Sequence, residues 1–195
     1  MKESPAYSFI KERISLEFER LEKEKVTPWS FLTTDFGLHQ TDFFGKKINY
    51  KGVGFEGSPR EVFWNSFIQP FLKDIVSRSF SETAQFCSKR GIDGKIPLEE
   101  TAVILKQGIN KIYERMVDID RRLRGKGYPN SVSPYNPQPH LSNSEAFVEE
   151  RLWAETTLLP KRKNRLNAFY EEQKFWIWAI GIIIAIVGII IKVFG

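Results

Sequence analysis

The sequence predicts an all-α protein: an antiparallel helical bundle with an aromatic, glycine-rich loop, followed by one C-terminal transmembrane helix. Three observations lead to this prediction. Residues 175–191 contain no charged side chain, residues 98–123 carry apolar side chains at a seven-residue repeat, and two further segments carry them three and four residues apart. The predicted organisation is a helical domain at 1–125, a linker at 126–143, a juxtamembrane helix and basic segment at 144–174, and the span at 175–194.

The first helix is expected at about 5–25, because its apolar residues recur at helical spacing with Lys, Glu and Arg between them. The loop that follows is rich in aromatic residues and glycine, which is unusual for a disordered linker. Its aromatic residues are Trp29, Phe31, Phe36, Phe43, Phe44, Tyr50 and Phe55. We therefore expect an ordered loop, with a hairpin formed by 47–50 and 53–55 that turns at Lys51-Gly52.

The second helix is expected at 59–90. At its start, Ser58-Pro59-Arg60-Glu61 combines a capping box with proline at the first helical position. Its apolar face is wide enough to pack against more than one neighbour. The members of that face are Trp64, Phe67, Ile68, Phe71, Leu72 and Ile75.

The third helix, at 97–124, carries the seven-residue repeat that is typical of a left-handed supercoiled seam. The repeat consists of Leu98, Ala102, Leu105, Ile109, Ile112, Met116, Ile119 and Leu123. A tight connection at 92–95 precedes this helix, so the second and third helices are expected to form an antiparallel hairpin. The repeat fits an intramolecular bundle with the first helix or an intermolecular coiled coil, and the bundle is favoured.

The linker at 126–143 is rich in Pro, Ser and Asn, so it is expected to be extended. Ser142-Asn143-Ser144-Glu145 is a second capping box and predicts the start of a helix that continues through Trp153. His140 lies in the linker and is expected to be solvated.

The uncharged segment is long enough for a membrane span, because twenty helical residues extend for about 30 Å, the thickness of a bilayer's hydrocarbon core. Basic residues precede it, at Lys161, Arg162, Lys163 and Arg165, and they predict that the N-terminal domain faces the cytoplasm. The start of the sequence has no apolar segment typical of a signal peptide. We therefore expect a tail-anchored, single-pass protein of a bacterial inner membrane or an endoplasmic reticulum.

The span also carries small residues at helical spacing, Gly181, Ala185 and Gly188. Small side chains allow two helix backbones to approach closely in lipid, so this face is expected to favour a homo-oligomer. The single cysteine, Cys87, excludes an internal disulfide and is interpreted as a small buried apolar residue.

The net charge of +5 is concentrated beside the predicted span, which favours anionic lipid headgroups as partners and not nucleic acid. A weaker anion site is expected where Lys46, Lys47, Lys51 and Arg60 surround the start of the second helix. The neighbouring Gly52-Val53-Gly54-Phe55-Glu56-Gly57 matches a dinucleotide-binding pattern, but nothing downstream alternates strand and helix. A glycine-rich turn is therefore the preferred interpretation, and no cofactor is expected.

The candidate catalytic residues are Asp35, His39 and Asp42, which lie close together in the aromatic loop and could hold a divalent metal or act as a base with its orienting carboxylate. Their spacing is not diagnostic, and no metal site is predicted. Asp118 and Asp120 resemble a D-x-D motif, but they flank a residue of the repeat and are interpreted as a solvated, charge-paired face.

Three functions follow from these observations. The first is an adaptor or scaffold whose helical domain binds a protein partner at the membrane, through a helical or aromatic surface such as 29–55. The second is a membrane-active effector whose oligomerising span perturbs the bilayer. The third is a membrane-anchored enzyme that uses Asp35, His39 and Asp42. The first is favoured, and the partner remains unidentified.

Overall fold

The computed structural model describes residues 3–32, 37–51, 67–126 and 133–159. Those up to Thr156 belong to one compact, mostly helical unit, and the second unit is described only over residues 157–159. Within these ranges, no helix combines the length and the apolar composition needed to cross a bilayer. The predicted span at 175–194 lies outside the described residues.

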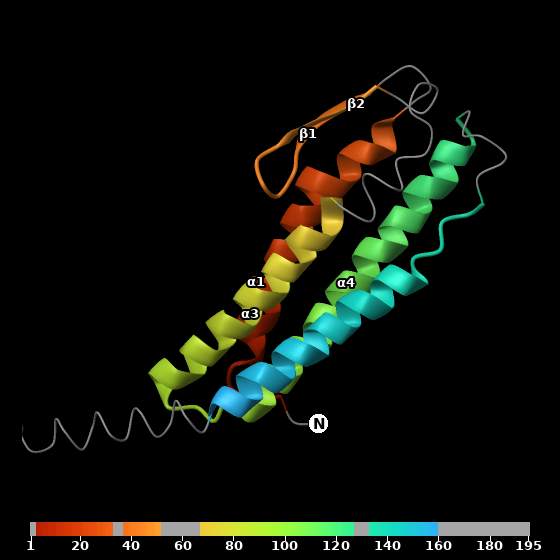
Figure 1. Ribbon diagram of the computed structural model, residues 1–195. Coiled ribbons are helices and arrows are strands. Elements are labelled where there is room, and N and C mark those ends of the chain that lie inside the picture. The colour runs from red at the N-terminus through yellow and green to blue at the C-terminus, as the bar shows by residue number, and fades with distance from the viewer. Residues whose placement is uncertain (1–2, 33–36, 52–66, 127–132, 160–195) are drawn as a thin grey trace, which may run out of the picture. The chain divides into compact units, whose positions relative to one another are not determined.

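The compact unit is an elongated bundle with a small hairpin at one end (Figure 1). Helices α1 (Tyr7–Leu21), α3 (Ile68–Arg90) and α4 (Lys95–Arg124) run side by side with a fourth helix, which begins at residue 138. Strands β1 (Leu38–Thr41) and β2 (Lys47–Tyr50) form the hairpin. The prediction of a helical bundle with an antiparallel helix pair is confirmed for this part of the chain.

The apolar repeat of α4 is buried within the chain itself. All eight of its members are at most 4 % exposed. They pack with the buried face of α1, which consists of Ile10, Ile14, Phe18 and Leu21. Because the repeat is covered by other helices of the same chain, the intramolecular bundle is the arrangement that forms.

The connection between α3 and α4 is a tight turn that begins with a left-handed glycine. Gly91 has φ +64°, a conformation in which glycine has no steric cost. The N–H of Ile92 then donates to the carbonyl of Cys87 at 2.9 Å. Further along, the hydroxyls of Thr83 and Thr101 lie 2.9 Å apart inside the protein, so α3 and α4 are joined by a polar contact as well as by apolar packing. The capping box at 58–61, which was predicted to begin α3, lies outside the described residues.

The chain leaves α1 through a π-helical turn, Glu22–Val26, and a 3-10 turn, Thr27–Phe31. This path buries Trp29 completely, with its ring 5.6 Å from Tyr50 and 6.3 Å from Phe67. These aromatic residues of the loop therefore form a core at the hairpin end of the bundle. Others are exposed, namely Phe31, Phe43 and Phe44.

The hairpin contains the predicted strand at 47–50, paired with a strand that the sequence analysis did not predict. Lys47–Tyr50 pairs antiparallel with Leu38–Thr41, which precedes it, and Tyr50 is opposite Leu38. The turn lies at 42–46, where the Asp42 carboxylate accepts hydrogen bonds from the backbone N–H groups of Phe44 (2.9 Å) and Lys46 (2.7 Å). Gly45 at φ +85° completes it. Residues 53–55 lie outside the described part of the chain.

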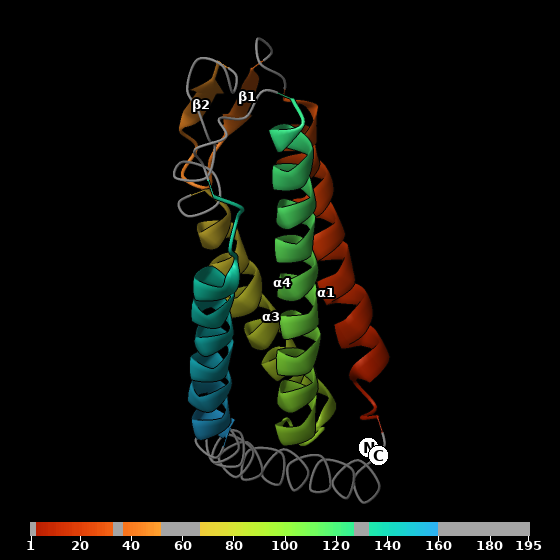
Figure 2. The same ribbon diagram turned by 90° about the vertical axis from the view of Figure 1, so that its right-hand side faces the viewer.

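The last helix begins at residue 138, earlier than the predicted capping box at 142–145. The carbonyl of Pro137 accepts from the N–H groups of His140 and Leu141, and Pro139 falls in the first turn, where its missing N–H costs nothing. Val148 is fully buried. The helical domain therefore extends beyond residue 125, because the helix over 138–156 packs onto it (Figure 2).

We predict that Gly108→Ala destabilises the protein by about 1–3 kcal/mol, because overpacking forces neighbours to move. A Cβ at Gly108 would lie 2.3 Å from the ring of Phe18, which is where α1 crosses α4. Thermal unfolding of the full chain measures the effect.

Gly125→Ala is the matched control, since its Cβ would meet only the Arg122 carbonyl at 3.5 Å. Combining Gly108→Ala with Phe18→Leu should cost less than the sum of the two single substitutions. Equal stability of the Gly108→Ala and Gly125→Ala proteins would contradict the close helix contact.

Candidate functional site

A groove lies between α3 and the helix over 138–156, above α4. Its volume is about 320 Å³. The floor is apolar and consists of Leu72, Val76 and Ile109. The walls and rim combine polar, charged and apolar side chains, namely Gln69, Lys73, Asn143, Ser144, Ala146, Phe147 and Glu150.

The two walls of the groove are fixed by polar contacts. At one end, Nε2 of Gln69 lies 3.3 Å from Nδ1 of His140, so this histidine is not simply solvated as predicted. Lys73 lies 5.6 Å from the ring centre of Phe147, a cation–π contact that crosses the groove.

Beside the groove, the helix over 138–156 is joined to α4. The hydroxyl of Tyr113 lies 3.3 Å from that of Ser144. Burial raises the pKa of Tyr113, although the hydrogen bond with Ser144 acts in the opposite direction. Lys106 forms an ion pair with Glu149. These contacts give the groove a defined width.

The chemistry of the groove is that of a binding surface. Its floor can cover apolar side chains, and its rim offers amide, hydroxyl, ammonium and carboxylate groups for polar contacts. The one hydroxyl of the lining, Ser144, has its hydrogen-bond contact with Tyr113. The sequence analysis did not predict this groove because its two walls lie about 70 positions apart in the chain. The one feature of the sequence that pointed to it was the wide apolar face of the second helix, which predicted several neighbours for that helix.

The candidate catalytic residues of the loop do not meet in the described structure. His39 is an exposed residue of β1, opposite Asn49. The Asp42 carboxylate holds the hairpin turn, and Asp35 lies outside the described residues. Across the described ranges, no three His, Cys, Asp or Glu side chains are grouped so that they could hold a metal ion.

The candidate anion-binding lysines of the loop all lie on or beside the hairpin. Lys46 and Lys47 are exposed at its turn, and Lys51 is exposed where β2 ends. Arg60, the basic residues at 161–165 and the small residues Gly181, Ala185 and Gly188 lie outside the described part of the chain.

Another hollow, of about 290 Å³, lies where the hairpin meets α1 and α3. Leu21, Ile75, Phe43 and Phe71 supply its apolar lining. Arg78 crosses between the helices here and contacts Glu17 at 3.0 Å and Asp74 at 2.8 Å. The hydrogen bond from Arg78 lowers the pKa of Glu17.

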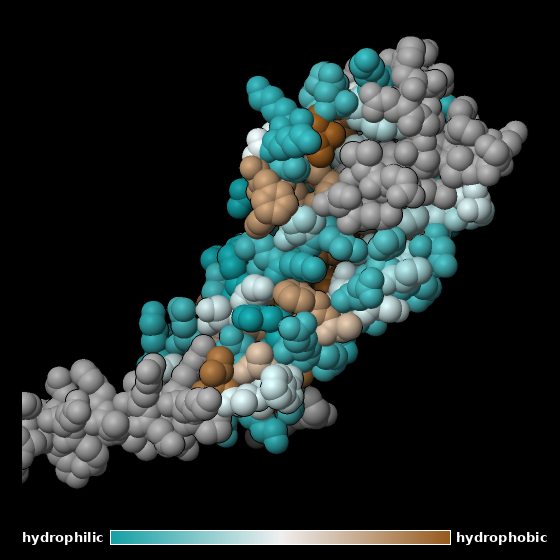
Figure 3. All heavy atoms as spheres, viewed as in Figure 1, coloured by the Kyte–Doolittle hydropathy of each residue, from teal (hydrophilic) through white to brown (hydrophobic). Residues whose placement is uncertain are grey.

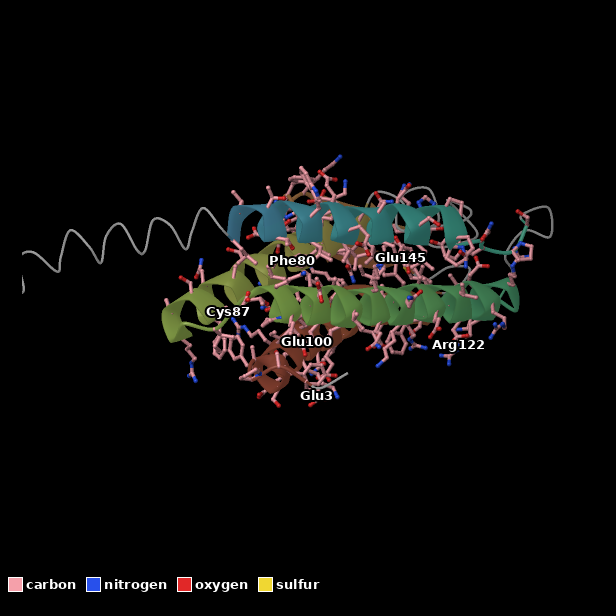
Figure 4. The ribbon with its side chains drawn as sticks, turned by 90° about the horizontal axis from the view of Figure 1, so that it is seen from below. Glu3, Phe80, Cys87, Glu100, Arg122 and Glu145 are labelled. Carbon is pink, nitrogen blue, oxygen red and sulfur yellow. The ribbon has the colours of Figure 1, made fainter. Side chains whose placement is uncertain are left out.

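Two carboxylates of α4 are structural. Glu100 is 5 % exposed and accepts from the backbone N–H of Ser4 at 2.7 Å, on the side of α4 that faces the start of α1 (Figure 4). Asp120 is 3 % exposed and accepts from the N–H of Tyr135 at 3.1 Å. Asp118 instead pairs with Arg121 at the surface. The interpretation as a charge-paired face holds for both aspartates, since Asp120 pairs with Arg124 at 3.3 Å, but Asp120 is buried and not solvated.

Cys87 is a buried residue of α3, as predicted. Burial raises the pKa of its thiol, and the negative charges of Asp93 and Glu100 act in the same direction. A thiol with a raised pKa is a poor nucleophile, so Cys87 serves as a packing residue.

We predict that Asp120→Ala exposes the backbone around Tyr135 to exchange. Removing the carboxylate takes away an acceptor of this amide, at a local cost of about 1–3 kcal/mol. Hydrogen exchange of the Tyr135 amide should accelerate about 10- to 100-fold if it exchanges through local opening. Asp118→Ala is the matched control and should leave the exchange rate of the Tyr135 amide unchanged. Similar exchange in both variants would contradict the role of Asp120.

Comparison with protein-family models, with curated proteins and with solved structures gives no match. The function is therefore inferred from the chemistry of the groove, the hairpin and the predicted span.

Proposed function

We propose that this chain is a single-pass membrane protein whose helical domain, on the cytoplasmic side, acts as an adaptor that binds a protein partner. The groove between α3 and the helix over 138–156 carries the proposal. It joins an apolar floor to a polar rim, the combination by which proteins bind an amphipathic helix or an extended apolar segment. The uncharged segment at 175–194, preceded by basic residues, supports attachment to a membrane.

The groove supports an adaptor better than an enzyme. Of the three candidate catalytic residues, His39 is exposed on β1 and Asp42 is engaged in the turn. The groove contains apolar side chains that a partner could cover, beside charged residues of both signs, Lys73 and Glu150. Such a rim favours one orientation of a partner through charge complementarity.

Membrane attachment is tested by alkaline extraction of membranes from cells that express the chain. We expect the full-length protein to remain in the membrane fraction, because a span of about 20 apolar residues is not released by high pH. A version that ends at Lys174 should be released. Release of both forms would contradict the span.

Partner binding is tested by placing a photo-crosslinking amino acid at Asn143, on the rim of the groove, and irradiating intact cells. We expect one discrete adduct with a different protein. Adding Ala146→Trp to the labelled chain should abolish it, because Ala146 is an exposed position that lines the groove, and an indole there fills the space.

Ser142→Trp is the matched control, since Ser142 is exposed on the same helix but does not line the groove. It should leave the adduct unchanged. An adduct between two copies of this chain would replace the adaptor proposal with self-association. An adduct that survives Ala146→Trp, or no adduct, would contradict binding in the groove.

A further inference from the structure

The turn of the hairpin presents an unusual combination of side chains. Phe44 is 81 % exposed and Phe43 is 39 % exposed, although both are large apolar residues. Their rings contact each other edge to face, with centroids 5.4 Å apart. Lys46 and Lys47 follow directly and are exposed as well. Two adjacent phenyl rings beside two ammonium groups thus project from one end of the bundle.

The position of this turn is fixed by contacts on both sides. Within the turn, the Asp42 carboxylate binds the N–H groups of Phe44 and Lys46. Below it, Lys25 donates to the carbonyl of Thr41 at 3.0 Å, and Phe43 packs edge to face on Phe71 of α3 at 5.3 Å. Phe44 is therefore exposed on a supported turn.

The charge around the turn is positive. Over residues 38–51 there are three lysines and one acidic residue, Asp42, whose carboxylate is engaged by backbone N–H groups. Of the described acidic residues that line the hollow beside Phe43, Glu24 pairs with Arg20 at 3.2 Å, and Glu17 and Asp74 pair with Arg78. An anionic surface would thus meet Lys46 and Lys47 with little opposing charge.

The shape of the turn distinguishes it from the groove. Figure 3 shows a mostly hydrophilic face on which apolar atoms protrude at the hairpin. A protruding pair of rings fits a deformable apolar medium, and phenylalanine is one of the residues that interfacial segments bury at the boundary between headgroups and acyl chains. Lysines beside them can extend their charged ends to lipid headgroups while the rings enter the apolar layer.

We propose that residues 42–47, which are the hairpin turn and the first residue of β2, form a second membrane contact of this protein. Phe44, supported by Phe43, enters the interfacial layer of an anionic bilayer, and Lys46 and Lys47 bind its headgroups. The bilayer is the one that holds the predicted span, so the inference rests on the membrane attachment proposed above. The hairpin and the C-terminal end of the helix over 138–156 lie at opposite ends of the bundle (Figures 1 and 2).

The length of the chain permits this contact. Helix α4 has 30 residues, so the bundle is about 45 Å long. Eighteen residues separate Thr156 from Phe175, and they can reach at most about 60 Å. The bundle can therefore lie along the bilayer with the hairpin in contact with it.

The test uses the full chain in vesicles with either neutral or partly anionic lipid. A nitroxide label replaces Phe44 through Phe44→Cys in a Cys87→Ala background, and its depth is read from its relative accessibility to oxygen and to a water-soluble nickel chelate. The matched control label is at Leu16→Cys, an exposed apolar site of α1 that is 53 % exposed. Retention of the chain after alkaline washing reports the span independently.

We expect the label at position 44 to enter the anionic bilayer and the label at position 16 to stay in water. Lys46→Gln with Lys47→Gln should reduce the ratio of inserted to free turn about 25-fold, since each lysine near an anionic surface contributes about five-fold. A label at position 44 that stays in water while the span is retained would overturn the inference and leave the attachment intact. Insertion that is equal in neutral and anionic vesicles would overturn the role of the lysines. A chain that is released by alkaline washing while the turn still inserts would overturn the span and support the hairpin contact.

Discussion

The described domain depends on α4 being buried on more than one side. Its apolar repeat packs against α1 and α3, and its two buried carboxylates bind the segments that lead into the flanking helices. Glu100 binds the backbone before α1, and Asp120 binds the backbone before the helix that begins at 138. A buried carboxylate is costly unless hydrogen-bond donors satisfy it, so each of them favours one position of the neighbouring segment. The apolar repeat thus supplies stability, and the two acids help to specify the arrangement.

The helices were predictable where a single chain segment contains the whole signal. The seven-residue repeat predicted α4 because it is local and continuous. The strand at 38–41 was missed because the turn that joins it to 47–50 depends on a side chain, Asp42, that binds the backbone. The start of the last helix was placed too late because prolines near 137–139 indicate a linker, yet proline is also favoured in the first turn of a helix.

The candidate sites were less predictable, because they depend on residues that are distant in the sequence. The groove combines Gln69 and Lys73 with residues near 143–150, and no periodicity relates these segments. His39 and Asp42 are close in sequence, but the strand and the turn give them separate roles. The solvent exposure of individual aromatic residues was not predictable from the sequence either. Trp29 and Phe44 belong to the same aromatic loop, yet Trp29 is fully buried and Phe44 is almost fully exposed. Only the fold separates the aromatic residues that form the core from those available to a partner.

The two proposed contacts use opposite shapes for different partners. The groove is concave, and its rim carries charges of both signs, Lys73 and Glu150. It can therefore select a partner whose own charged side chains are arranged to complement this pair. The hairpin turn is convex and carries adjacent lysines, so it responds to the charge density of a surface and not to a sequence. If both act in one molecule, the hairpin orients the bundle, because insertion of Phe44 fixes which side of the hairpin end faces the bilayer. The direction in which the groove faces would then depend on lipid charge, which links the composition of the membrane to access of the protein partner.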